Sequence, residues 1–241
     1  MCPRGNGAVR RNGRTENAVY SFVARPRHPA WLMAGFWVCV LIALAAVVRR
    51  LLALVRPMQG RPEQMAAVDA TFSAHAALTV AHIVPAAIFV VLAAMVLLRR
   101  PASGEWLERL LFASGVITGA TAYAMSAYAV GGWIERSAVL VFDSWFLFSL
   151  SRAWMLGLRG QAERSREWMT RAVGVLLGIA TTRPVMGVFF ATSSRTHLDT
   201  HQFFGIAFWI GFTINTVIVE LWLHSSRRRS AIYELPREYT L

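Results

Sequence analysis

Charged residues are scarce in this chain, at 16% of its 241 residues, whereas soluble domains usually have about 25%. Lysine is absent, so all 25 basic residues are arginines, and with 13 acidic residues they give a net charge of +12. Only two cysteines occur, Cys2 near the N-terminus and Cys39 inside an apolar run. They form no paired spacing, so they predict neither a disulfide framework nor a metal site.

Sequence motifs for chemistry are also missing. No serine, cysteine or carboxylate motif is typical of hydrolysis or phosphoryl transfer, so we do not expect an enzyme. No internal repeat occurs, which argues against the repeat architecture of many transporters. Nucleic acid is not an expected partner, because that would require a basic face on a folded domain. Here the arginines separate apolar runs, as membrane orientation signals do.

Long apolar runs are what the chain does have. A helix needs roughly 20 mostly apolar residues to cross a bilayer, and six runs of about this length fill the sequence. They predict an all-α, polytopic membrane helix bundle with the lipid bilayer as its partner, between a mobile basic tail at 1–29 and a basic tail at 224–241. The six predicted transmembrane spans are 30–48, 76–98, 110–130, 138–158, 172–191 and 203–223.

The distribution of arginine predicts the orientation of these spans. If the N-terminus is cytoplasmic and six spans alternate, cytoplasmic segments hold 17 arginines and external segments hold 6. The positive-inside rule then favours both termini in the cytoplasm. Segment 49–71 disagrees, with four external arginines. Either it lies along the membrane surface, or the first run is not an ordinary span.

A cleaved signal peptide is the alternative for the first run, since Ala43-Leu44-Ala45 offers a small-residue cleavage site. The apolar core of a signal peptide is usually about 7–15 residues, and this run is longer. We therefore expect a retained membrane anchor.

The segments between the spans carry a few local signals. Residues 63–73 are typical of a short interfacial helix, Gly131-Gly132-Trp133 of a sharp external turn, and 159–171 of a short charged loop. Inside the spans, glycines recur at four-residue spacing, a pattern that lets membrane helices approach closely. The glycines expected at such helix–helix contacts are Gly115, Gly119, Gly174 and Gly178.

Ionisable residues inside the spans give the main functional signal, because each costs at least ~2.5 kcal/mol in hydrocarbon and needs a partner or water. At ~1.5 Å per residue, His82, Asp143 and Arg183 lie ~8–12 Å from the external surface, and Tyr123 lies at a similar level. One hypothesis is that these four residues surround a polar cavity in the outer third of the bundle. Arg183 would be held by Asp143, and His82 would be available for protons, metal or haem. The alternative is a structural salt bridge plus a hydrogen-bonded histidine.

Other polar residues in the spans have a structural interpretation. Pro184 follows Arg183 and predicts a kink, whose freed carbonyls nearby threonines or water can satisfy. Arg152 and Glu220 lie ~9 and ~5 Å from the cytoplasmic ends of their spans. There they either form an ion pair or extend to the lipid headgroups. Nine residues separate Asp143 from Arg152, so the two lie on opposite faces of one helix and in different sites.

Several histidines lie near the external ends of the spans. His197, Asp199 and His201 form a loop cluster, and His75 is the one further candidate ligand. Histidines four residues apart share a face on a helix and can bind a metal there. Outside a helix the spacing has no such meaning, so we predict an ordinary polar loop and no metal site.

Short motifs from residue 142 onward carry a family resemblance, together with His82-Ile83. With them, residues 70–223 resemble the bacterial membrane family known as domain-of-unknown-function family 2306. The resemblance implies a multi-helix protein of the cell inner membrane without an established reaction. The motifs are Phe142-Asp143-Ser144-Trp145, Arg152-Ala153-Trp154, Arg166-Glu167-Trp168-Met169-Thr170-Arg171 and Gly178-Ile179-Ala180-Thr181-Thr182-Arg183-Pro184-Val185-Met186.

The chain departs from that family at two histidines. Where the family has a histidine before Arg-x-Trp-Met-x-Arg and a His-Arg pair at the start of the third span, this chain has Ser165 and Glu108-Arg109. His82 is then the only histidine well inside a span. A haem with two histidine ligands would need a loop residue such as His201.

Three functions remain open from the sequence. The first is an integral membrane protein of unassigned role that binds a small molecule or lipid in the outer cavity. The second is a haem- or quinone-linked electron-transfer protein, for which haem b would be the cofactor and His82 the best-placed ligand. The third is a small proton-coupled transporter, suggested by Arg183-Pro184. We favour the first, since no motif supports the others, and we predict no cofactor.

Overall fold

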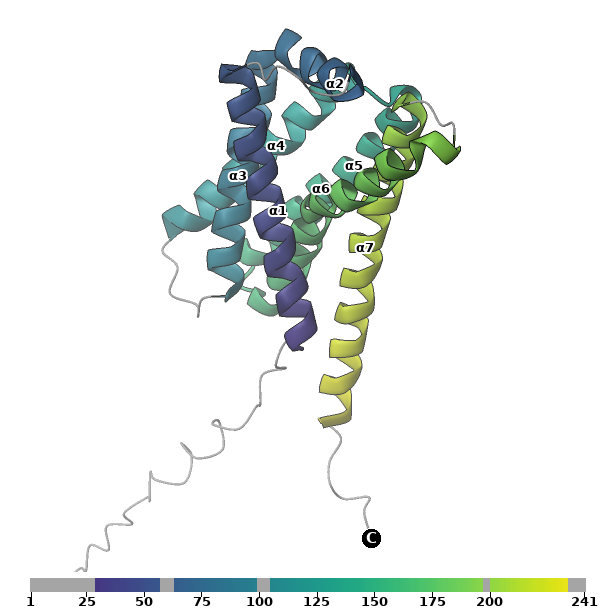
Figure 1. The fold of residues 1–241 in the computed structure, drawn as a ribbon. Coiled ribbons are helices and arrows are strands. Elements are labelled where there is room, and N and C mark those ends of the chain that lie inside the picture. Colours follow the sequence, from purple (N-terminus) through teal and green to yellow (C-terminus); the bar gives the residue numbers. More distant parts are fainter. Residues whose placement is uncertain (1–28, 57–62, 99–104, 197–199, 234–241) are drawn as a thin grey trace, which may run out of the picture.

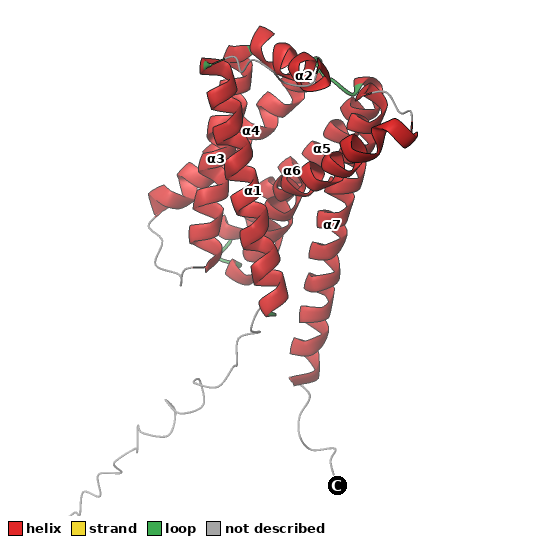
Figure 2. Ribbon diagram, in the orientation of Figure 1, coloured by secondary structure: helices red, strands yellow, loops and turns green. Residues whose placement is uncertain are grey.

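The computed structural model of the protein describes residues 29–56, 63–98, 105–196 and 200–233. Within these ranges the chain is entirely helical and contains no strand (Figure 2), which confirms the predicted all-α class. The predicted tail at 1–29 lies almost wholly outside the described residues, whereas residues 224–233 of the other predicted tail continue the last helix. The seven helices of the described ranges are α1 (Ala30–Val55), α2 (Glu63–Ala74), α3 (Ala76–Leu98), α4 (Glu105–Ser126), α5 (Gly132–Leu158), α6 (Ala162–Thr196) and α7 (Thr200–Tyr233).

Five of these helices, α1, α3, α5, α6 and α7, are long and apolar enough to cross a membrane, as expected for a multi-pass membrane protein. The remaining predicted span, 110–130, corresponds to α4, which is not among the five. This helix begins with a charged turn that contains Glu108 and Arg109, and it ends at Ser126, before the predicted boundary. Its apolar part is therefore shorter than expected.

The long helices run alternately up and down, and α2 lies across one end of the bundle (Figure 1). We call this the α2 end. The start of α1 and the end of α7 both lie at the opposite end, which we call the terminal end. Helix α4 packs against α3 and α5, and α6 packs against α5 and α7. Helix α1 contacts α3 and α6.

Several helices extend beyond the predicted spans. Helix α1 continues through Arg49 and Arg50 to Val55, because the apolar residues 51–55 prolong its pattern. The predicted loop at 159–171 is wrong: α6 begins at Ala162, after a turn in which Gly160 has a φ of +70°. Charged residues there occupy the first turns of a helix instead. The short helix predicted at 63–73 is confirmed as α2.

Glycines bring the helices into close contact, as their spacing predicts. A Cβ on Gly115 would lie 2.7 Å from the Leu150 side chain of α5, and one on Gly178 would lie 2.6 Å from Phe212 of α7. Larger residues would push these helices apart. Gly119 and Gly174 make equivalent contacts with Leu147 and Val219.

Apolar side chains cover both the inside and the outside of the bundle. Phe89, Phe146 and Phe203 are completely or almost completely buried. On the outer faces, Leu41 of α1 is 64% exposed and Leu221 of α7 is 65% exposed, and many other large apolar residues are exposed with them. A helix that is apolar all round is typical of a membrane environment, so this surface suits contact with lipid.

Candidate functional site

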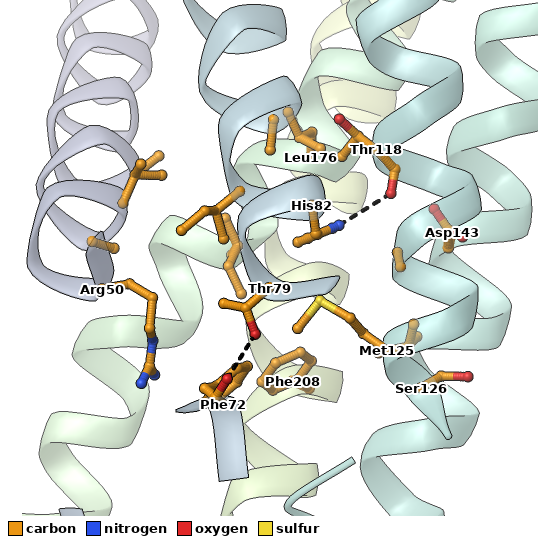
Figure 3. Close-up of a pocket in the computed structure, with 18 of the residues that line it drawn as sticks. Arg50, Phe72, Thr79, His82, Thr118, Met125, Ser126, Asp143, Leu176 and Phe208 are labelled. Atoms are coloured by element: carbon orange, nitrogen blue, oxygen red, sulfur yellow. Dashed lines mark hydrogen bonds between the residues drawn. The ribbon is translucent and has the colours of Figure 1, made fainter. Parts of the chain in front are cut away.

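A cavity of about 230 Å³ lies in the half of the bundle nearest the α2 end. Side chains from all seven helices of the described residues line it, and most of them are apolar. The last turn of α2 contributes Thr71 and Phe72, so this helix covers part of the cavity. Figure 3 shows the polar side chains that reach into this apolar space.

Three of the four polar residues predicted to meet do line this one cavity. His82 comes from α3, Asp143 from α5 and Arg183 from α6. Tyr123 does not line it; its hydroxyl lies 2.6 Å from Ser144 Oγ instead. Depth along the helices was therefore a sound guide to the level of these groups, but not to the direction in which each one points.

His82 is oriented by the neighbouring helix α4. Its Nδ1 lies 3.2 Å from the Thr118 carbonyl oxygen and 3.1 Å from Thr121 Oγ1 (Figure 3). A carbonyl oxygen only accepts hydrogen bonds, so Nδ1 of the neutral ring carries the proton. The lone pair then lies on Nε2, which has no hydrogen-bond partner among the described residues. His82 is thus prepared to accept a hydrogen bond or proton.

Arg183 has no hydrogen bond or ion pair with any described residue, and its Nε is buried without a partner. Asp143 Oδ2 is also buried and without a partner. The expected ion pair between these two residues is not formed in the described part of the chain. Asp143 and Arg183 therefore line the same cavity without binding each other.

Arg50 fastens α2 to the end of α1, which the sequence did not predict. Its side chain is almost completely buried, and its Nη1 lies 2.5 Å from Asp69 Oδ1 of α2. The guanidinium also lies 3.9 Å from the centre of the Phe72 ring. Arg49 lies 3.6 Å from the same carboxylate. Arg50 was assigned to a loop, although the apolar residues after it signalled a longer helix.

Glu135 is a second lining residue that the sequence analysis missed. It is buried, and its Oε2 accepts the Gly131 N–H at 2.6 Å, so it caps the start of α5. A carboxylate in the first turns that reaches back to the N–H of the N-cap residue is a known capping pattern. Its position just after Gly131-Gly132 carried that signal, but the segment was taken as a loop.

The histidines that the sequence places near the external ends of the predicted spans do not gather around one point in the described residues. His201 lies in the first turn of α7 and its Nδ1 faces the Val130 carbonyl, and it does not line the cavity. His75 lines the cavity and stacks on Tyr128, with ring centroids 3.7 Å apart. His197 and Asp199 lie outside the described residues. Among the residues searched, no group of three or more His, Cys, Asp or Glu can hold a metal ion.

At the terminal end, the ion pair considered for Glu220 involves a different arginine. Both carboxylate oxygens of Glu220 bind Arg171, at 2.6 and 3.0 Å, and the alternative of an ion pair with Arg152 is not formed in the described residues. Arg152 instead lies over the Trp168 ring, 5.7 Å from its centre. Arg171 was placed in a loop by the sequence, whereas α6 carries it into the bundle opposite α7.

Pro184 lies inside the continuous helix α6, as expected for a proline in a membrane span. The carbonyl freed by this proline is that of Ala180. The nearby threonines bind elsewhere: Thr181 Oγ1 donates to Asn215 Oδ1 at 2.9 Å, and Thr182 Oγ1 donates to the Gly178 carbonyl at 3.0 Å. These hydroxyls therefore join α6 to α7 and to its own preceding turn.

Comparisons of the chain with models of protein families, with curated proteins and with solved structures find no match. The resemblance of residues 70–223 to domain-of-unknown-function family 2306 stays a prediction. A functional conclusion rests on the geometry of the cavity.

Proposed function

We propose that the protein binds a small molecule or lipid in the cavity at the α2 end. The observation that supports this is that the ionisable groups of the cavity lie in one space without binding one another. His82, Asp143 and Arg183 share one mostly apolar space, yet none of them binds another. Unpartnered ionisable groups inside a membrane protein are costly and are usually functional. A bound ligand, with its water, supplies the missing partners.

The size and lining of the cavity limit the ligand. A volume of about 230 Å³ is slightly below the ~300–1,000 Å³ of typical ligand pockets. It suits a small molecule or one lipid chain better than a complete haem group. Apolar walls favour an apolar ligand body. The Arg183 donors and the acceptor on His82 Nε2 would orient a polar head.

We further propose six membrane spans, with both termini in the cytoplasm of a cell whose inner membrane holds the protein. Helix α4 packs between α3 and α5, and it runs in the direction opposite to both of them (Figure 1). If α4 is counted as a span, the start of α1 and the end of α7 lie on one side. The 17 arginines of the segments on that side, against 6 on the other, favour the cytoplasm. The α2 end and its cavity would then face outward.

Mass analysis of the purified protein tests the binding proposal. Full-length protein is purified in mild detergent, and the small molecules extracted from it are identified and quantified. We expect one molecule that copurifies with the wild type and is largely lost in Arg183→Gln. The matched control is Arg195→Gln, which changes an exposed arginine in the last turn of the same helix and should keep the molecule. Equal retention in both variants, or no bound molecule, would contradict the proposal.

An optical spectrum of the same sample separates the ligand classes. A small molecule or lipid leaves no Soret band, whereas the haem alternative requires one. A Soret band that disappears in His82→Ala would replace the small-molecule proposal with the haem alternative.

A further inference from the structure

Two arginines from different helices lie over one indole ring near the terminal end. The Cζ atom of Arg171 lies 4.6 Å from the centre of the Trp168 ring, and that of Arg152 lies 5.7 Å from it. Both distances are within cation–π range. Trp145 and Phe148 pack against the same ring, with centroid distances of 6.0 and 5.5 Å. We call these five residues the arginine–tryptophan cluster.

The cluster carries one positive charge that no described carboxylate neutralises. Glu220 binds Arg171 through both of its oxygens. Glu167, the acidic residue that directly precedes Trp168 in the sequence, binds Arg227. Arg152 has no hydrogen bond or ion pair with a described residue. An arginine in this state near a membrane surface attracts an anion, and its planar donors suit a phosphate.

The order of side chains along α5 matches the order of groups in a phospholipid. Trp145, Phe148 and Arg152 are spaced by three and four residues, so they share one face of the helix. Arg152 is nearest the terminal end, and the rings lie deeper in the bundle. Phe148 is 49% exposed, and Val141, one turn deeper than Trp145, is 52% exposed. A lipid chain can therefore lie on this face while its phosphate meets Arg152.

The depth of Arg152 fits this arrangement. It lies six residues before the end of α5, which is ~9 Å along the helix axis. The long side chain of an arginine at that depth extends toward the headgroup level. Tryptophan is also enriched at this level of a membrane. None of the five cluster residues lines the cavity at the α2 end.

We propose that the arginine–tryptophan cluster binds an anionic phospholipid of the leaflet at the terminal end. Arg152 donates N–H groups to the phosphate, and an acyl chain packs along Phe148 and Trp145. Arg171, held by Glu220, keeps the Trp168 ring in place within the cluster. This site is separate from the cavity and does not depend on the ligand proposed there.

Native mass spectrometry of the full-length protein tests this site. The protein is equilibrated with equal amounts of phosphatidylglycerol and phosphatidylcholine, and the lipids that stay bound are counted. We expect the wild type to prefer phosphatidylglycerol, and Arg152→Gln to weaken that preference about fivefold, a value typical of one arginine at an anionic surface. Arg152→Lys keeps the charge and should keep most of the preference.

The control variant is Arg164→Gln, which changes an exposed arginine that binds only Gln161 among the described residues. Its preference should equal that of the wild type. Equal losses in Arg152→Gln and Arg164→Gln would show diffuse attraction and overturn the proposal, as would a wild type without preference. Displacement of the lipid by glycerol phosphate would show a site for the free headgroup instead. If Arg152→Gln does not fold, Phe148→Ala is measured in its place. Unchanged lipid retention in Phe148→Ala would contradict the proposal that an acyl chain packs on Phe148.

Discussion

Acidic residues in this bundle are of two kinds: some bind an arginine, and others have a buried carboxylate oxygen without a hydrogen-bond partner in the described residues. Asp69 and Glu220 each hold a buried arginine, at 2.5 Å and 2.6 Å, whereas Asp143 has a buried oxygen without a partner. A buried charge that loses its partner destabilises a protein strongly. A charge that never had a partner is itself a source of instability. Acidic residues of the two kinds should therefore respond in opposite ways to neutralisation.

We predict that Asp143→Asn raises the free energy of unfolding by about 1 kcal/mol, because it removes an unpartnered charge from an apolar setting. The same variant should retain less of the cavity ligand. The measurement is reversible unfolding in mixed micelles, with the endogenous ligand removed from all samples. A loss of stability would mean that Asp143 has a partner in the folded protein.

Asp69→Asn is the matched variant with the opposite expected sign. It leaves Arg50 buried without its carboxylate, so the free energy of unfolding should fall by about 2 kcal/mol. Combining it with Arg50→Gln should recover part of that loss, since the two changes act on one contact. Additive losses in the double variant would show that Arg50 and Asp69 are not coupled, and that α2 is held in another way.

At the same scale, the sequence identified the residue types of the site better than their contacts. Depth along an apolar run placed His82, Asp143 and Arg183 at one level, and all three line one cavity. It did not give the direction of each side chain, so the predicted Asp143–Arg183 pair is absent from the described residues. Glu135 and Arg50 were missed because both were assigned to loops. Their contacts depend on helix ends, which apolar patterns define poorly.

Some neighbouring helices approach so closely that only glycine, which has no side chain, fits at the contact. Gly178 of α6 faces Phe212 of α7, and an added Cβ would lie 3.0 Å from the Phe212 Cα, which belongs to the backbone. Backbone cannot move aside as a flexible side chain can. Gly187 lies in the same helix, and a Cβ there would meet nothing within 4 Å. Gly178 and Gly187 therefore lie in the same helix, but only Gly178 has a close neighbour.

We predict that Gly178→Ala lowers the free energy of unfolding by about 1–3 kcal/mol, the usual cost of overpacking a close contact. Gly187→Ala should leave it unchanged or raise it slightly, because alanine favours the helix without meeting a neighbour. Both variants are unfolded in the same micelles as the wild type. Similar effects in the two variants would contradict the close packing of α6 against α7.

For the elements, the sequence predicted the class and the approximate positions but not the ends. The span at 76–98 coincides with α3, because apolar residues there begin and stop abruptly. Helix α6 begins ten residues before its predicted span at 172–191, since charged residues are also good helix formers outside a membrane. Hydropathy marks the part of a helix that suits lipid and not the whole helix.

For the molecule as a whole, α4 decides the topology. The other five long helices are apolar enough to cross a membrane, and an odd number of spans would put the termini on opposite sides. With α4 as a sixth span they would share a side, and Figure 1 shows the start of α1 and the end of α7 at the same end of the bundle. Because α4 packs between α3 and α5 in the bundle, we propose six spans.

Reporter fusions test this topology. A fluorescent protein that folds only in the cytoplasm and a phosphatase that is active only outside are each fused within 99–104 and after Ala129. We expect a cytoplasmic signal from the first position and an external signal from the second, since α4 separates them. The same side for both positions would contradict six spans.

The most direct test of the central claim, that the cavity holds a ligand, is an experimental density map of the full-length protein in lipid nanodiscs. We predict non-protein density between His82 and Arg183, within hydrogen-bond distance of His82 Nε2 or of the Arg183 guanidinium. A cavity that has closed, with Arg183 bound to Glu135 or Asp143 and no added density, would contradict it.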